Sequence, residues 1–125
     1  MRKQTRRIWP VLAVLGVCFA LGGCGDPPGK GPKAERGYER SAPVVAALER
    51  YRAERGQYPD SLGALVPRHL PESALRVPER RQERYPLEYH RTAAGFELSF
   101  RYAGPGMNEC TYTPVDRKWG CSGHF

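Results

Sequence analysis

Apolar residues between positions 41 and 56 recur with the spacing of a helix that buries one face. They fall at i, i+3, i+4 and i+7 and are Val44, Ala47, Leu48 and Tyr51. Ser41 is suited to cap the start of this helix and Gly56 to end it. A second, shorter helix is predicted over residues 60–66, because its apolar side chains share one side and Pro67 follows them.

The hydrophobic period changes to two after residue 86, which is typical of β-strands. The predicted strands are residues 87–91, 96–102, 110–113 and 118–121. Residues 92–95 suit a hairpin turn, and residues 67–86, with four prolines and mixed charge, suit an exposed connection. We therefore predict an α+β fold in which an N-terminal helix and a short helix pack on a small antiparallel sheet.

The first 23 residues have the layout of a secretory signal peptide. Residues 1–7 carry four cations and no acid, and an apolar run follows to residue 23. A membrane-spanning helix needs about 20 apolar residues, whereas this run is shorter and contains Pro10. We therefore expect residues 1–23 to be removed.

The end of this run, Leu21-Gly22-Gly23-Cys24, resembles the bacterial lipobox. The resemblance implies cleavage between Gly23 and Cys24, a diacylglyceryl group on the Cys24 thiol and an N-acyl chain on the new amino end. The protein would be anchored to a membrane by this lipid and would carry no other cofactor. Gly25, rather than an aspartate, follows the cysteine, which indicates the outer membrane facing the periplasm. An ordinary signal peptide with a cysteine near its cut site is the alternative.

Residues 24–40 are predicted to be a lipidated flexible tether, and residues 41–125 the folded domain. The segment after Cys24 is rich in glycine, proline and charge and has no apolar period. Residues 1–23 hold four of the 20 cations and none of the 13 acids, so the mature chain has a net charge of only +3. Much of the basic character therefore belongs to the signal, and no nucleic-acid partner is expected.

Two cysteines, Cys110 and Cys121, remain once Cys18 is removed with the signal and Cys24 is lipidated. In an oxidising compartment such a pair is expected to form a disulfide. A zinc site is the alternative, but it needs more ligands, and the only histidine near the pair in the sequence is His124.

Residues 47–62, with Leu65 and Val66, resemble a segment of the type II secretion pseudopilins. The shared positions are Leu48, Tyr51, Gly56, Tyr58, Pro59 and Leu62. The resemblance implies a pilin-like head from about residue 42 to the C-terminus. In this chain a lipobox stands where that family has a prepilin leader and a filament-forming helix. Filament assembly by the usual route is therefore not expected.

The side chains that carry chemistry are scattered along the sequence. His69, His90 and His124 share no metal-ligand spacing, and Ser99 lies in a predicted strand without the context of a catalytic nucleophile. Residues 104–125 offer only Glu109 and Asp116 as acids, so a calcium site is not predicted. We expect no enzyme, no metal and no small-molecule substrate.

Two classes of function remain open. The first is a non-catalytic envelope component whose pilin-like head binds a protein of a secretion or envelope assembly. The second is a small periplasmic inhibitor or immunity lipoprotein directed against a hydrolase or toxin. In either case exposed aromatic side chains are the expected partner contacts, and the candidates are Trp119, Tyr112 and Phe125.

Overall fold

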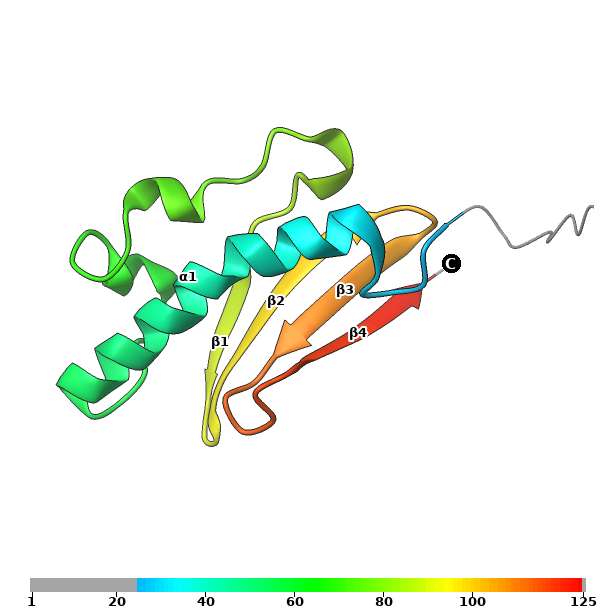
Figure 1. Cartoon of the computed structure of the whole chain (residues 1–125). Coiled ribbons are helices and arrows are strands. Elements are labelled where there is room, and N and C mark those ends of the chain that lie inside the picture. Colours follow the sequence, from blue (N-terminus) through cyan, green and yellow to red (C-terminus); the bar gives the residue numbers. More distant parts are fainter. Residues whose placement is uncertain (1–24, 125) are drawn as a thin grey trace, which may run out of the picture.

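One long helix lies across a four-stranded antiparallel sheet in the computed structural model, which describes residues 25–124 (Figure 1). The elements are α1 (Gly31–Arg55), the 3₁₀ turns η1 (Leu62–Leu65), η2 (Glu72–Leu75) and η3 (Arg81–Glu83), and the strands β1 (Glu88–Thr92), β2 (Gly95–Ala103), β3 (Met107–Tyr112) and β4 (Trp119–His124). The predicted α+β class is confirmed. No helix within residues 25–124 is both long enough and apolar enough to cross a bilayer.

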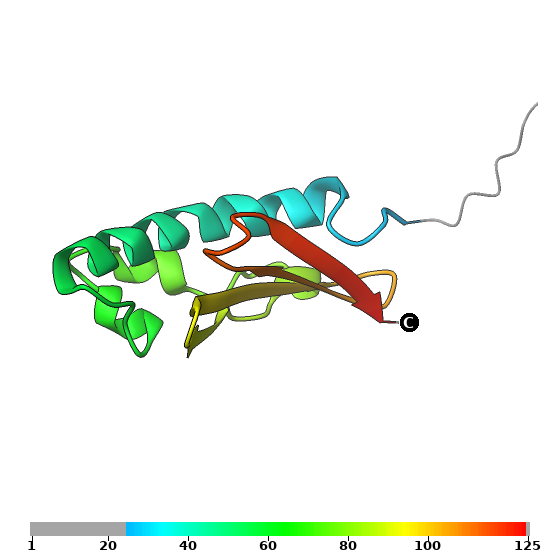
Figure 2. The ribbon, with the colours of Figure 1, turned by 90° about the horizontal axis from the view of Figure 1, so that it is seen from below.

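The strands form a meander in the order β1-β2-β3-β4, so each strand pairs with its neighbour in the sequence. The register places one row of large side chains across all four strands: Tyr89 opposite Leu98, Leu98 opposite Tyr112, and Tyr112 opposite Trp119. Paired residues of an antiparallel sheet lie on the same face. Figure 2 shows α1 along one side of the sheet, and this row lines the face that the helix covers. The alternate residues, mostly polar, belong to the opposite face.

The helix begins at Gly31, ten residues before the predicted start at Ser41. The prediction of a flexible tether is therefore wrong for residues 31–40. Ala34 and Ser41 are fully buried and Tyr38 is half-buried, so the inward stripe extends to the first turn of the helix through i, i+4 and i+7. Pro32, at the start of the helix, suits that position because its missing N–H has no partner there.

Residues 25–30 also lie against the sheet instead of extending from it. The backbone N–H of Gly29 donates to the Tyr102 hydroxyl (2.9 Å), and the Tyr38 hydroxyl donates to the Gly29 carbonyl (2.9 Å). These bonds join the start of the described chain to both α1 and β2. Cys24, the preceding signal segment and Phe125 lie outside the described residues, so the structure does not bear on cleavage or lipidation.

The predicted short helix and the exposed connection are both altered by packing. Instead of a helix over residues 60–66 there is the 3₁₀ turn η1, whose Leu65 is fully buried. Residues 67–86 are not wholly exposed, because Leu70 and Glu83 are buried.

The hydroxyl of Tyr89 on β1 donates a hydrogen bond to the Pro59 carbonyl (2.6 Å). Burial raises the pKa of this hydroxyl to about 12.

The core consists of two clusters that α1 covers together. One gathers around Leu48, Leu65 and Phe96, and the other around Ala34, Phe100 and Cys110. Tyr38 and Trp119 contact each other and both contact Phe100, with ring centroids 5.1–5.5 Å apart. Gly37 makes this packing possible, because a Cβ at that position would overlap the Phe100 ring.

The predicted disulfide between Cys110 and Cys121 is present. The two residues are register partners on β3 and β4, with Cα atoms 4.1 Å apart. Cys110 is fully buried, and the Tyr38 hydroxyl lies 3.2 Å from the Cys121 sulfur. The disulfide therefore joins the last strand to the sheet directly beneath the first turns of α1.

Gly37→Ala is expected to lower the free energy of unfolding by about 1–3 kcal/mol, because the new methyl group forces α1 away from Phe100. Urea denaturation followed by circular dichroism measures the change. Gly120→Ala is the control, since nothing lies within 4 Å of a Cβ built at that position. Equal effects of the two substitutions would contradict the proposed close contact.

Replacing both Cys110 and Cys121 by alanine is expected to lower the free energy of unfolding by about 3 kcal/mol. The two cysteines are separated by 11 positions, and opening a loop of that size restores this much chain entropy to the unfolded state. The urea midpoint should fall accordingly, whereas Cys24→Ala should leave it unchanged. Detection of free thiols at both positions under non-reducing conditions would contradict the disulfide in the mature protein.

Candidate functional site

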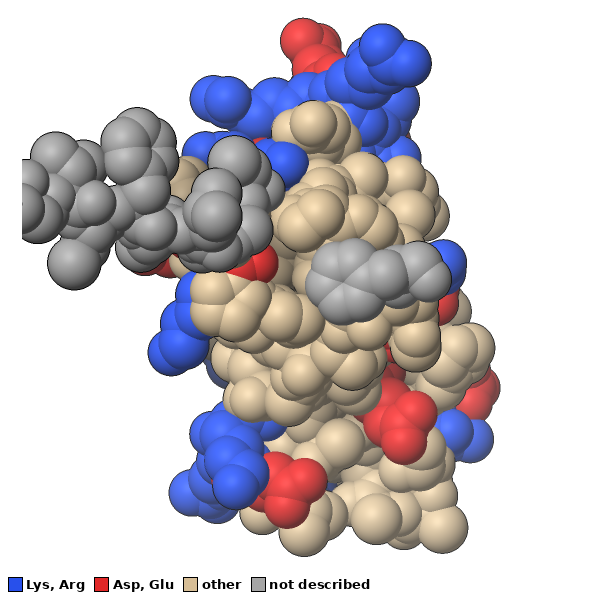
Figure 3. Space-filling model, turned by 90° about the vertical axis from the view of Figure 1, so that its right-hand side faces the viewer, with Lys and Arg blue, Asp and Glu red and all other residues tan. Residues whose placement is uncertain are grey.

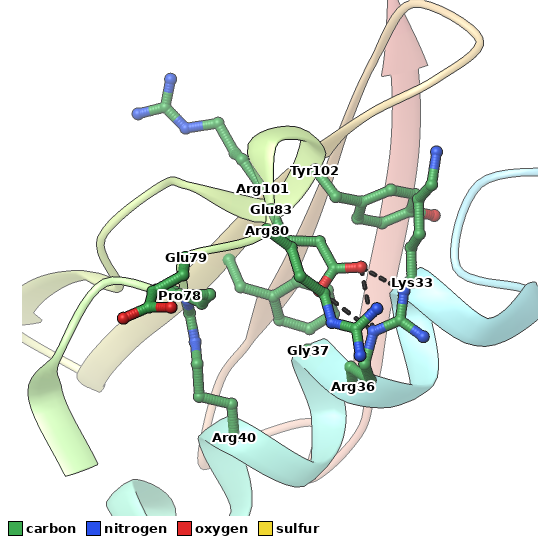
Figure 4. Close-up of a pocket in the computed structure, with 11 residues that line it drawn as sticks. Lys33, Arg36, Gly37, Arg40, Pro78, Glu79, Arg80, Glu83, Arg101 and Tyr102 are labelled. Carbon is green, nitrogen blue, oxygen red and sulfur yellow. Dashed lines mark hydrogen bonds and ion pairs between the residues drawn. The ribbon is translucent and has the colours of Figure 1, made fainter. Parts of the chain in front are cut away.

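A basic cleft opens between the first half of α1, strand β2 and residues 78–83 (Figure 4). Its volume is about 350 Å³, within the range of small-ligand sites. Phe100 and Tyr102 supply apolar ring surface, and the charged side chains around them come from α1 and from the segment that includes η3. These charged residues, which define the basic cleft, are Lys33, Arg36, Arg40, Glu79, Arg80, Glu83 and Arg101.

Arg36 and Glu83 form a close ion pair at one side of the basic cleft. The Arg36 Nε lies 2.9 and 3.0 Å from the two carboxylate oxygens of Glu83, and the guanidinium Nη2 also contacts the carboxylate. Hydrogen bonding from Arg36 lowers the pKa of the Glu83 carboxyl, and the same interaction raises the pKa of Arg36. The pair joins α1 to η3 and so fixes the width of the cleft.

Three other cations of the cleft have no carboxylate within ion-pair distance among the described residues: Lys33, Arg40 and Arg80. Lys33 donates to the Ala103 carbonyl (2.9 Å). Arg40 donates twice to the Tyr85 carbonyl (3.1 Å each), and its buried Nε has no hydrogen-bond partner. Desolvation by burial lowers the pKa of Arg40, and the charge of Glu83 opposes that shift.

An entry hollow of about 450 Å³ adjoins the basic cleft at the start of the described chain. Lys33, Arg36 and Tyr102 line both spaces, and Gly25 and Pro105 form the outer wall of the hollow. Figure 3 views the molecule from this end and shows Lys and Arg side chains gathered along its upper margin. The basic cleft therefore lies beside the point at which the chain leaves residue 24.

A second, less polar depression lies at the opposite end of the strands. The tip groove has a volume of about 480 Å³ and is lined by Thr92, Ala93, Ala94, Phe96, Glu97, Thr113, Pro114 and Val115. Val115 is 69% exposed, the most exposed of the large hydrophobic side chains in the described range. Its loop is ordered by Thr113, which accepts from the backbone N–H of Asp116 (3.3 Å) and donates to its carboxylate (3.0 Å).

The aromatic residues predicted as partner contacts do not form an exposed patch. Trp119 and Tyr112 are half-buried, their ring centroids lie 5.5 Å apart, and both pack on the core beneath α1. Phe125 lies outside the described residues. The register of β3 and β4 directs both side chains toward the helix, and each stays partly exposed.

The structure places the histidines and Ser99 in different surroundings. His69 contacts Glu54 (3.3 Å) beside Tyr51, whereas His90 and His124 are exposed on different strands. Ser99 shares a hydrogen bond of 2.8 Å with Thr111 on the face that α1 leaves uncovered. Within residues 25–124, no three side chains of the metal-binding types come together.

The basic cleft was not predicted from the sequence. The sequence favours a solvated loop over a basic ligand patch for residues 79–84 and a tether for residues 31–40, so it does not predict that their cations meet. The available signal was the spacing of Lys33, Arg36 and Arg40 along one helical flank.

Comparison with protein-family models, with curated proteins and with solved structures finds no match for this chain.

Glu83→Gln is expected to reduce the fall in the free energy of unfolding that occurs as the pH drops. Because the folded pKa of Glu83 lies below its ordinary value of 4.5, its ionised form stabilises the protein fully above that pH and loses this effect as the pH falls below it. Urea denaturation at neutral pH should show a less stable variant, and the difference from the unmodified protein should shrink below pH 4.5.

Glu79→Gln serves as the matched control, since Glu79 is exposed and forms no ion pair among the described residues. Its pH profile should follow that of the unmodified protein. A Glu83→Gln profile parallel to both would show that the Arg36 pair does not contribute to stability.

Proposed function

We propose that this chain is a non-catalytic, lipid-anchored envelope protein that binds a partner protein through the tip groove. The observation that carries the proposal is the position of Gly25, the first described residue. Gly25 lies against Pro105 in the turn between β2 and β3, at one end of the domain. The tip groove occupies the other end.

The distance between these ends supports a role in reaching outward from a membrane. Consecutive Cα atoms are about 3.8 Å apart, so a lipid on Cys24 would hold the turn between β2 and β3 close to the bilayer. Strand β2 has nine residues and extends roughly 27 Å toward the tip groove. The tip groove would then be the part of the domain presented to proteins of the periplasm.

The shape of the tip groove suits an apolar side chain of a partner. Its walls come from two separate turns that touch, since a Cβ at Gly95 would lie 2.6 Å from the Pro114 ring. Arg117 and Lys118, both exposed, flank Val115 and favour acidic surroundings on the partner. The likeness of residues 47–62 to pseudopilins supports an assembly of the secretion type as the source of that partner.

Photo-crosslinking in cells tests this proposal. A crosslinking amino acid at position 115 in the full chain is expected to capture one envelope protein, because an exposed apolar side chain at an interface is shielded by its partner. The same amino acid at position 90, on the uncovered face of the sheet, is the matched control. Val115→Asp should abolish capture from a crosslinker at position 93, whereas Ser122→Asp should not.

Membrane fractionation with lipid labelling tests the anchor. Cys24→Ala should lose the label and move the protein to the soluble fraction.

The crosslinked partner distinguishes the two classes of function. Capture of a secretion or pilus subunit from position 115 would support the proposed class. Capture of a single tightly bound hydrolase would favour the inhibitor class instead, and equal capture from positions 115 and 90 would refute the tip groove as the interface.

A further inference from the structure

Several cations of the basic cleft have no carboxylate partner among residues 25–124. The Arg36–Glu83 pair is internally neutral and joins two elements. Arg101 turns to the opposite face, where it pairs with Glu88 and approaches Glu109 (3.8 Å). Lys33, Arg40 and Arg80 remain without a carboxylate, and the one other acid of the lining, Glu79, forms no ion pair among residues 25–124.

Arg40 is the most informative of these cations. A guanidinium has five N–H donors, and the structure pairs only its two terminal nitrogens, both with a single carbonyl oxygen. Its Nε is buried without an acceptor. Such a group is costly to bury alone. An anion in the cleft would compensate its charge and could accept from the N–H groups of the terminal nitrogens that the Tyr85 carbonyl leaves free.

The lining indicates the kind of anion. Arginine binds phosphate and carboxylate groups through pairs of N–H donors, and a nearby lysine adds a point charge. Lys33 and Arg40 project from one flank of α1, and Arg80 enters from the facing segment (Figure 4). Phe100 and Tyr102, both buried, line the same cleft and keep water from part of it, which strengthens the attraction.

The position of the cleft indicates where the anion comes from. Lys33 and Arg36 border both the basic cleft and the entry hollow, which reaches Gly25. A lipid on Cys24 would therefore bring phospholipid headgroups to the mouth of the cleft. Anionic headgroups attract clustered Lys and Arg residues at a membrane surface.

We infer that the basic cleft binds the phosphate group of an anionic membrane phospholipid, which orients the domain on the bilayer beside its anchor. This inference rests on the proposed lipid anchor. One covalent lipid restrains a single point and leaves the domain free to rotate, whereas a second contact beside it fixes which end faces outward. The tip groove would then be held away from the membrane.

Vesicle sedimentation tests the inference on the mature chain, exported with Cys24→Ala so that binding does not depend on lipidation. The protein should bind vesicles of phosphatidylcholine and phosphatidylglycerol in equal parts at least tenfold more tightly than vesicles of phosphatidylcholine alone. The triple variant Lys33→Gln, Arg40→Gln, Arg80→Gln should lose binding by about two orders of magnitude, since each cation near the membrane surface contributes about fivefold.

The control variant removes the same charge from the other end of the domain: Arg55→Gln, Arg117→Gln, Lys118→Gln. All three of these residues are exposed, and binding should remain within about twofold of the unsubstituted chain if the cleft is the site. Arg80→Gln alone, at an exposed position, guards against misfolding of the triple variant and should weaken binding about fivefold to tenfold.

Each remaining outcome overturns the inference. Equal losses in the two triple variants would show attraction by overall charge, and no preference for phosphatidylglycerol would exclude a headgroup site. Binding of inorganic phosphate, followed by the NMR signal of the Arg40 Nε–H group, without any vesicle binding would indicate a free anion instead. Crosslinking from position 115 is scored separately, so failure here leaves the proposed partner contact to be judged by its own test.

Discussion

The close approach of α1 to strand β2 at Gly37 and Phe100 is the contact on which the rest of the structure depends. With a hydrogen atom as its side chain, Gly37 lets the helix backbone meet the aromatic ring directly. Tyr38, at the next position, then contacts Trp119 on β4 and the disulfide between β3 and β4. A bulkier residue at position 37 would separate the helix from both core clusters at once, because interiors of proteins are closely packed.

The same contact positions residues 25–30. With α1 packed closely on the sheet, the Tyr38 and Tyr102 hydroxyls bond to the backbone of Gly29 and hold this segment against the turn between β2 and β3. The domain therefore has two different ends. One carries residues 25–30 and the basic cleft, and the other carries the tip groove with the exposed Val115.

Charged and uncharged side chains lie on different sides of α1. The inward stripe of α1 is uncharged, and its flank facing residues 78–83 carries Lys33, Arg36 and Arg40. Only Arg36 meets a carboxylate there, and this pair anchors the segment that forms the opposite wall of the cleft. Lys33 and Arg40 have no carboxylate within ion-pair distance in the described part of the chain, and such charge is costly to bury without a partner.

Local periodicity was sufficient to predict the α+β class, the strand segments, the hairpin turn at residues 92–95 and the end of the helix at Gly56, where φ is 79°. Counting cysteines was sufficient for the Cys110–Cys121 disulfide. The early part of the helix was missed because its buried positions, Ala34, Gly37 and Ser41, have small side chains with little apolar signal. These residues pack on aromatic side chains of the sheet that lie far away in the sequence. Gly37 and Phe100, for example, are 63 positions apart.

The tertiary structure alone decided which charged and aromatic residues meet. Trp119 and Tyr112 are residue types that are common at protein interfaces. Here they face the helix, because the register of β3 and β4 places them on the inner side of the sheet. Arg40 and Arg80 looked like solvated surface charges, yet chain folding brings their two segments to opposite walls of one cleft. The sequence by itself determined the local elements and the cysteine pair, which depend on neighbouring positions and on counting. Only the packing of α1 on the sheet decided the two sites, because each site joins segments whose separation in the sequence carries no periodic signal.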